Sequence, residues 1–408
     1  MKNLKFMIVA LVAMLGFSSC EQEHDHDCGV YDHSADLVGT WTCLTSDYAE
    51  ALVIAADGSA VSTGVEDGEF WENVNGTIVV KDGRVTMVFE DDDNFEGHFD
   101  IIPGEAFSIY TDSGERLTYR YCANDLSEEI VGMWVCNEGP QEVMGGMAIQ
   151  TYTKDGKLVV ATNTTSADGG SIVNKEDSYV VIGDMLVFKI ADASQYMATR
   201  LVYAPNGTSL GDIMTQKMYL TTDDGVLEAT SSWLRVEQEL DLVGKKYSYN
   251  NVYISNVKGS DKEINFMGYK FAFANMDGSR LEMVMKSALF GFEFPDANTI
   301  SYTYQLNGIT ETYNLPLEVE GNKMTFKMSA KVPSLKDVVF YAFQDTDGCQ
   351  LHLYIHESSF VSFFTNMQAI MAVAVNPEFD ITNPAAIDAI YNEIDEVVES
   401  INLSVVMK

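Results

Sequence analysis

Short apolar runs joined by Asp-Gly turns recur along this chain, and they restrict its fold more than any other sequence feature. The run 77–80 (TIVV) leads through Asp82-Gly83 into 85–89 (VTMVF). Asp-Gly between two apolar runs is typical of a tight β-hairpin, because a type I′ turn needs positive φ at both central residues. Apolar and polar residues alternate over 281–286 and 324–329, which favours strands with one buried face. The sequence predicts an all-β protein built of antiparallel sheet.

A short motif divides the chain into three units. Residues 37–43 (LVGTWTC) recur as 130–136 (IVGMWVC), and a weaker copy, 242–247 (LVGKKY), has Lys246 in place of the tryptophan. Acidic residues precede each copy. A chain of 408 residues has room for about two to four domains. The repeats predict domains over 36–125, 126–240 and 241–408, each with room for a small β-barrel or sandwich.

The N-terminus has the pattern of an export signal. Lys2 and Lys5 precede an apolar run over 6–17, which is shorter than the roughly 20 residues of a membrane-spanning helix. The following Ser18-Ser19-Cys20 resembles the lipobox of bacterial lipoproteins, in which the cysteine is acylated and becomes the new N-terminus. The resemblance implies a lipoprotein signal peptide over 1–19 and a lipid anchor on Cys20. The alternative is an ordinary secretory signal with an unmodified cysteine.

Residues 20–35 are acidic and have little to bury, which predicts a flexible tether between the lipid and the first domain. An acidic stretch after the lipidated cysteine resembles the surface-export signal of lipoproteins from one group of Gram-negative gut bacteria. That resemblance implies the outer face of the outer membrane; elsewhere an acidic residue there implies retention at the inner membrane. His24, His26 and Cys28 match no closed Cys/His spacing, so we expect no metal site.

A glycine and a tryptophan two residues apart open the first two units. A Gly-x-Trp on the first strand of a hairpin series resembles the lipocalin/calycin superfamily, and in particular the lipocalin-like domains of bacterial lipoproteins. In that family the glycine lets the chain turn into the barrel and the tryptophan plugs the closed end. The resemblance implies tandem up-and-down barrels, with barrel-closing roles for Gly39, Trp41, Gly132 and Trp134. The alternative is any meander with a buried tryptophan.

The third unit ends differently. Aromatic and methionine residues at helical spacing predict a helix over 358–373. Asn383-Pro384 is a cap followed by proline at the first helical position, which predicts a second helix to about Ser400. Residues 403–407 then indicate a closing strand. The third domain is therefore expected to be a larger calycin-like β-barrel with two added C-terminal helices.

Cys43 lies on the first predicted strand of the first unit, and Cys122 ends the last one. In a closed barrel these strands are neighbours, so a disulfide between the two cysteines is possible in an oxidising compartment. Other cysteines are present, and the sequence alone cannot fix the connectivity.

Charge and motifs exclude several function classes. The chain has 61 acidic and 25 basic residues, a net charge of −36, and no basic cluster, which argues against nucleic-acid binding. Residues 207–211 match Gly-x-Ser-x-Gly, but a turn before them and a strand after them favour a hairpin loop. No Walker loop, Rossmann glycine pattern or Cys-x-x-Cys is present. We expect no catalytic residues, no cofactor and no enzyme activity.

The sequence therefore predicts a lipid-anchored, non-catalytic binding protein for a small apolar molecule or a glycan. The alternative is a structural or accessory lipoprotein that docks an outer-membrane protein complex, and an enzyme of unknown type ranks third. Barrels of about eight strands can enclose one small ligand. Within the third unit, we expect aromatic and methionine side chains to favour an apolar ligand: Tyr302, Tyr304, Phe326, Met328 and Phe363.

Overall fold

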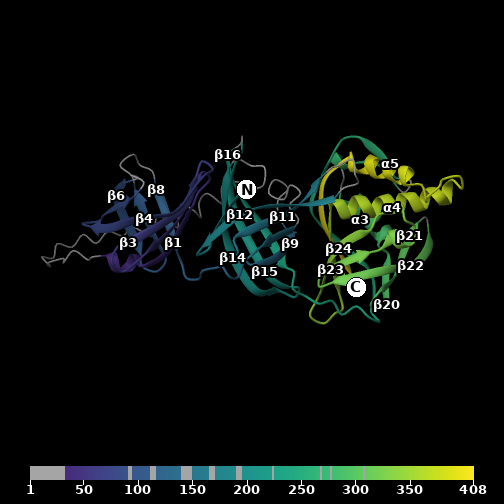
Figure 1. Ribbon diagram of the computed structural model, residues 1–408, viewed down its shortest axis with the longest axis horizontal. Coiled ribbons are helices and arrows are strands. Elements are labelled where there is room, and N and C mark those ends of the chain that lie inside the picture. The colour runs from purple at the N-terminus through teal and green to yellow at the C-terminus, as the bar shows by residue number, and fades with distance from the viewer. Residues whose placement is uncertain are drawn as a thin grey trace, which may run out of the picture.

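The structure is a computed structural model that describes residues 33–90, 94–110, 116–138, 149–164, 171–189, 195–222, 225–266, 269–275, 278–306 and 308–408. These residues form three closed antiparallel barrels of eight strands each, which lie in a row (Figure 1). The expected all-β class with tandem up-and-down barrels is confirmed. The expected signal peptide and Cys20 lie outside the described residues, as does the tether except for 33–35, which begin a 3-10 helix, η1 (His33–Leu37). Within the described ranges no helix has both the length and the apolar character needed to span a bilayer.

The first barrel is a meander in which each strand pairs with the next and β1 pairs with β8. Asp82 and Gly83 have φ of 52° and 71°. The expected type I′ turn between β4 and β5 is therefore confirmed. The strands are β1 (Gly39–Leu44), β2 (Tyr48–Ile54), β3 (Ser59–Glu66), β4 (Glu69–Lys81), β5 (Arg84–Phe89), β6 (Asn94–Ile102), β7 (Ala106–Tyr110) and β8 (Arg116–Cys122).

The second barrel repeats this order and closes where β16 pairs with β9. Residues 207–211 join two antiparallel strands of this barrel, β14 and β15, so the expected hairpin loop is confirmed. The strands are β9 (Gly132–Glu138), β10 (Ile149–Tyr152), β11 (Lys157–Thr164), β12 (Ser171–Ile182), β13 (Met185–Lys189), β14 (Tyr196–Thr208), β15 (Gly211–Thr222) and β16 (Gly225–Arg235).

The third barrel closes through β17, which pairs with both β20 and β26. A separate hairpin and a helix, α3 (Gly278–Ala288), stand between β17 and β20 in the chain. The barrel strands are β17 (Lys246–Gly259), β20 (Gly291–Asp296), β21 (Thr299–Leu306), β22 (Ile309–Glu320), β23 (Lys323–Phe326), β24 (Val338–Gln344), β25 (Leu351–His356) and β26 (Val398–Met407). The hairpin strands are β18 (Glu263–Phe266) and β19 (Tyr269–Ala272).

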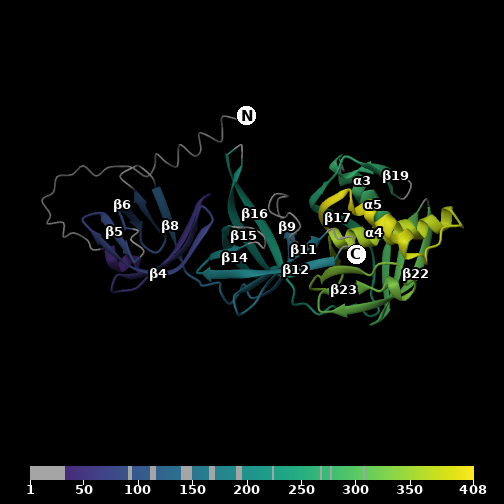
Figure 2. The same cartoon turned by 45° about the horizontal axis from the view of Figure 1, so that its top comes forward.

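Three α-helices, not the expected two, belong to the described part of the third barrel, and they gather on one side of it (Figures 1 and 2). Helix α4 (Glu357–Val375) matches the predicted helix. Helix α5 (Pro384–Asp395) begins as predicted, with the Asn383 side chain accepting a hydrogen bond from the Ala385 N–H, but it ends earlier because β26 begins at Val398. The predicted strand over 281–286 is wrong, since these residues lie in α3. Its buried side chains recur at helical spacing, whereas Met283 is 43% exposed: Leu281, Val284, Met285 and Ala288.

The expected disulfide is also wrong, because Cys43 and Cys122 are free thiols on opposite faces of the first barrel wall. Cys122 pairs with Thr40 across β1 and β8, so its side chain shares the outer face with the side chains of even-numbered β1 residues. The Cys43 side chain points inward and belongs to the core of the barrel. Neighbouring strands alone do not bring two cysteines together, because residues of opposite parity point away from each other.

The first and second barrels meet along an apolar seam and a polar cluster. Outward-facing residues of β2 and β3 pack against β13. Beside this seam the Asp184 carboxylate accepts hydrogen bonds from the Thr42 hydroxyl (2.7 Å) and the Cys122 thiol (2.9 Å), and it pairs with Arg200 at 3.3 Å. Three groups from two barrels therefore converge on one carboxylate, which fixes how the barrels face each other.

Residues 236–245 connect the second and third barrels, and two buried side-chain amides, those of Gln344 and Asn322, form hydrogen bonds with this segment. The Gln344 side chain accepts from the Asp241 N–H (2.6 Å) and donates to the Asp241 carbonyl (2.7 Å). The Asn322 side chain accepts from the Gln238 N–H at 2.7 Å. Apolar residues of both barrels, including Leu234 and Phe343, form a shared cluster beside this segment. The connection is therefore a packed joint.

Candidate functional site

The two tryptophans singled out by the repeat occupy equivalent positions. Both are fully buried, and each Nε1 donates a hydrogen bond of 2.7 Å to a carbonyl four residues earlier, from Trp41 to Leu37 and from Trp134 to Ile130. Their preceding glycines, Gly39 and Gly132, have nearly the same positive φ, 135° and 134°, a conformation that favours glycine. The barrel-closing roles themselves remain predictions.

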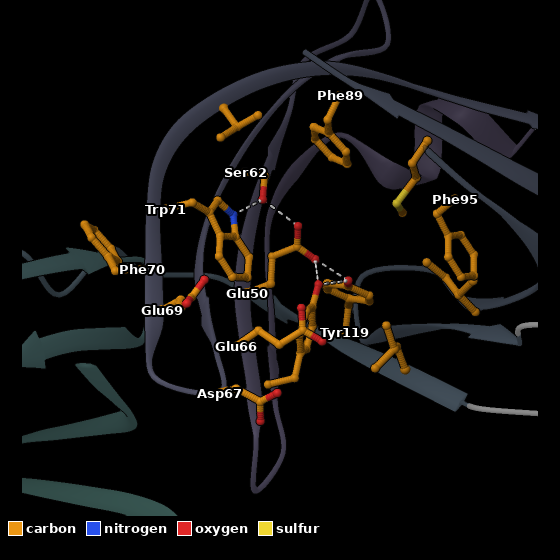
Figure 3. Close-up of a pocket in the computed structure, with 15 residues that line it drawn as sticks. Glu50, Ser62, Glu66, Asp67, Glu69, Phe70, Trp71, Phe89, Phe95 and Tyr119 are labelled. Atoms are coloured by element: carbon orange, nitrogen blue, oxygen red, sulfur yellow. Dashed lines mark hydrogen bonds between the residues drawn. The ribbon is translucent and has the colours of Figure 1, made fainter. Parts of the chain in front are cut away.

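The first barrel also holds a cavity of about 760 Å³, shown in Figure 3. Its interior residues come from most strands of the barrel, and its rim comes from the β3–β4 hairpin. The exposed rim residues include Glu66 and Glu69, so the cavity opens to solvent there. The lining residues are Tyr48, Glu50, Ser62, Glu66, Asp67, Glu69, Phe70, Trp71, Val74, Met87, Phe89, Phe95, Ile109, Leu117 and Tyr119.

The one buried carboxylate of this cavity lining is that of Glu50, which is only 5% exposed. It accepts hydrogen bonds from the hydroxyls of Tyr48 (2.6 Å), Ser62 (2.6 Å) and Tyr119. Trp71 extends the network, because its Nε1 donates to the Ser62 hydroxyl at 2.8 Å (Figure 3). A buried carboxylate needs such donors to replace its lost hydration. We call these five residues the Glu50 network.

Burial and the Glu50 charge together act on the neighbouring acids. They raise the pKa values of the Tyr48 and Tyr119 phenols well above their ordinary value. The same two causes raise the pKa of the Cys43 thiol to about 12. Both phenols and the thiol therefore stay protonated at neutral pH, and the hydroxyls remain hydrogen-bond donors to the carboxylate.

Trp71 reaches the interior because of a β-bulge. Val74 pairs with Ser62 and Trp71 pairs with Gly64, so two residues of β4 oppose one of β3 between these pairs. The extra residue shifts the alternation, and both Trp71 and Val74 line the cavity. A side chain at Gly64 would collide with the Trp71 ring and with the backbone of β2, so the indole can lie across β3 only because glycine stands there.

The rim is held in place by the second barrel. Asp67 and Gly68 form the tip of the β3–β4 hairpin, with φ of 50° and 82°. The Gly68 carbonyl accepts a hydrogen bond of 2.9 Å from the Tyr196 N–H. The rings of Phe70 and Tyr196 stack with centroids 4.8 Å apart. The contact between the barrels therefore also positions the opening of the cavity.

The third barrel divides the five residues that the sequence favoured for an apolar ligand. Phe326 and Phe363 are core residues, and neither lines the cleft described next. Tyr302, Tyr304 and Met328 line a cleft of about 540 Å³ between β21, β22 and the end of α4. In this cleft the Glu311 carboxylate accepts hydrogen bonds from the hydroxyls of Tyr304 (2.8 Å) and Tyr313 (2.6 Å). The predicted cluster exists: all five residues belong to the buried core, and three of them also line this cleft.

Sequence reasoning missed the whole Glu50 network. The one available signal was parity: Glu50 shares its face of β2 with Leu52 and Ile54, which are buried inside the barrel. Among the described residues no group of three or more His, Cys, Asp or Glu side chains is arranged to hold a metal ion. The arrangement offers hydrogen bonding, negative charge and aromatic surface.

Comparisons with known proteins leave the family open. No protein-family model matches the chain, and no curated protein matches it. Solved structures with some similarity include transferrin binding protein B from Haemophilus parasuis, as a double mutant of this vaccine antigen, with 11% identity and a TM-score of 0.22 over 88% of this chain and 65% of that one. The isotype 1 protein of the same name from serogroup B Neisseria meningitidis has 8% identity and a TM-score of 0.19, over 89% and 66%.

A porin-like protein from Bacteroides uniformis has 9% identity and a TM-score of 0.13, over 48% of this chain and 96% of that one. This chain thus spans slightly less than two thirds of both transferrin binding proteins. Similarities at this level assign no function to this chain.

Proposed function

We propose that this protein is a non-catalytic binding protein that captures a small molecule in the cavity of its first barrel. One observation carries the proposal: a cavity of about 760 Å³ that combines a buried polar network with aromatic walls. Small-molecule sites typically measure roughly 300–1,000 Å³ and pair apolar walls with a few well-placed polar groups. The size and the lining both fit that description.

The lining favours a ligand that carries polar groups on a ring. Glu50 and Ser62 offer hydrogen-bonding atoms inside the barrel, while Trp71, Phe89 and Phe95 offer apolar faces. Of the two ligand classes expected from the sequence, a glycan-like molecule suits this lining better than a purely apolar one, because a carboxylate has about four acceptor sites and Glu50 uses three of them within the network. All three hydrogen bonds to Glu50 come from hydroxyls, which are also the donor groups of a glycan.

We further propose that a lipid on Cys20 anchors the chain at the outer membrane, with the barrels at the cell surface. The support is the Ser18-Ser19-Cys20 pattern and the acidic stretch after it. Labelled palmitate should enter the wild-type protein and fail to enter Cys20→Ala. Protease treatment of intact cells should then degrade the barrels. Palmitate incorporation that persists in Cys20→Ala contradicts the anchor, and protection from protease contradicts the surface location.

The ligand proposal is tested by native mass spectrometry of the mature protein from its own host. Val74→Trp places a large ring in the cavity wall. Val88→Trp is the matched control, because Val88 is 46% exposed on neighbouring strand β5 and does not line the cavity. We expect a bound molecule in the wild type and in Val88→Trp, and none in Val74→Trp. Equal occupancy in both variants, or no bound molecule in the wild type, contradicts the proposal.

A further inference from the structure

We propose that the cavity of the first barrel takes a small organic cation, namely a protonated amine carried on a ring. This inference rests on the proposed binding function and names the ligand class of the same site. It follows from the acidic and aromatic side chains that line the cavity and from the lack of basic ones among them.

The lining is strongly acidic and has no basic group. Of the fifteen lining residues four are carboxylic acids, Glu50, Glu66, Asp67 and Glu69, and none is Lys, Arg or His. The chain as a whole has a net charge of −36. A concave site with low-dielectric walls and charges of one sign concentrates the opposite charge. An anionic ligand is repelled here, and a neutral one gains nothing from the charge.

Aromatic rings supply the second half of the recognition. Six of the fifteen lining residues are aromatic: Tyr48, Phe70, Trp71, Phe89, Phe95 and Tyr119. The Tyr48 and Trp71 rings lie 6.1 Å apart beside the Glu50 carboxylate. Ring faces attract cations, most strongly where water is displaced. Carboxylates on an open surface define no site, because water solvates them; here they surround a cavity that can also hold the body of the ligand.

Three arginines of the first two barrels bind groups that do not line the cavity. Arg84 pairs with Glu96 at 3.0 Å, and Arg116 donates to the Ser108 hydroxyl at 3.0 Å. Neither arginine lines the cavity. At the joint with the second barrel, Arg200 pairs with Asp184. The lining itself places no basic side chain opposite its four carboxylates, so a ligand cation is the complement that the lining calls for.

A ring-bearing amine has two common sources, an aromatic amine and an amino sugar. We therefore use tyramine and glucosamine as probes, with 4-ethylphenol and N-acetylglucosamine as their neutral counterparts. Binding to the full mature chain is measured by calorimetry. At least one amine should bind about tenfold or more tightly than its neutral counterpart, and the preference should shrink with salt because the rim is exposed. The amine that binds more tightly, tyramine or glucosamine, shows whether the ligand is an aromatic amine or an amino sugar.

The decisive variant neutralises the rim, Glu66→Gln with Glu69→Gln. Its control, Asp100→Asn with Glu105→Gln, removes the same charge from exposed residues of the first barrel that do not line the cavity. We expect the rim variant to lose the preference for amines and the control to keep it. Equal binding of amines and neutral counterparts, or equal loss in both variants, overturns the inference.

The proposed function and this inference fail in different ways. If native mass spectrometry finds a neutral molecule that Val74→Trp expels, binding stands and the cationic class is wrong. If neither a copurified molecule nor any probe occupies the cavity, both are wrong. A copurified amine that Val74→Trp expels supports both.

Discussion

The first and third barrels have walls of eight strands, yet one encloses a cavity and the other a packed core. In the third barrel α4 contributes Phe363, whose ring lies 6.0 Å from those of Tyr302 and Phe340. In the first barrel the interior holds the Glu50 carboxylate, which accepts hydrogen bonds from three hydroxyls. The number of strands therefore does not determine whether a barrel is filled. In the third barrel a helix side chain fills the interior, and in the first barrel a strand places a polar group there.

Removing the ring that fills the third barrel should have the largest effect. Phe363→Ala deletes a buried side chain that contacts three other aromatic residues. Such a substitution typically lowers the free energy of unfolding by about 3–5 kcal/mol. Urea unfolding, followed by hydrogen exchange in α4 and β24, measures the loss. A loss below about 1 kcal/mol means that α4 does not fill the barrel. The control is Tyr313→Ala, which removes an aromatic ring at a 39% exposed site and should cause a smaller loss.

In the first barrel the corresponding change is polar. Glu50→Gln puts an amide N–H₂ opposite hydroxyls that now donate to a carboxylate. Mismatched buried donors typically reduce stability by about 1–3 kcal/mol. Hydrogen exchange in β2 and β8 reports the change, with Glu72→Gln, an exposed residue outside the lining, as control. An unchanged protection pattern in Glu50→Gln shows that the network contributes nothing to stability.

Alkaline pH should destabilise the first barrel through Tyr48 and Tyr119. Burial and the Glu50 charge raise both pKa values well above the ordinary value, whereas in the unfolded chain phenols lose their protons near about pH 10. Above that pH the unfolded state binds fewer protons, so the free energy of unfolding falls as pH rises. Hydrogen exchange in β8 at pH 9 and at higher pH measures the slope. Tyr119→Phe should flatten it, and an equally steep slope in that variant disproves the link.

The smallest effect belongs to the third copy of the repeated motif. Lys246 occupies the tryptophan position and forms an exposed ion pair with Glu293 at 2.8 Å. Exposed pairs contribute about 0–1 kcal/mol. Lys246→Ala should therefore leave thermal unfolding nearly unchanged, in contrast to Trp41→Ala, which removes a fully buried ring. Comparable losses in the two variants would mean that the third copy does close its barrel.

The wall of each barrel was predictable, because alternation and Asp-Gly turns are local signals. The cavity was not. In β2, Ala49 and Ala51 face outward and still pack against the second barrel, so both faces of the strand carry apolar residues and the parity of Glu50 alone does not show which face is the interior. Trp71 was hidden by the bulge, which breaks the two-residue period.

The remaining errors arose where one pattern allows two structures. Leu281 and Met285 are spaced both for a helix face and for one side of a strand, and only packing in α3 distinguishes them. Cys43 and Cys122 were expected on adjacent strands, but parity across the register places them on opposite faces. The domain boundaries at 36–125, 126–240 and 241–408 stay predictions.

The β3–β4 hairpin limits how the first barrel can be separated from the second. Its tip carries the acidic rim of the first barrel and also contacts Tyr196 and Gln195 of the second. A substitution at Tyr196 can thus change the shape of the cavity opening, although Tyr196 itself does not line the cavity. Truncation, domain exchange or grafting of the first barrel alone removes the contacts of Tyr196 and Gln195 with this hairpin, so the first two barrels together are the smallest unit that keeps the entrance as it stands.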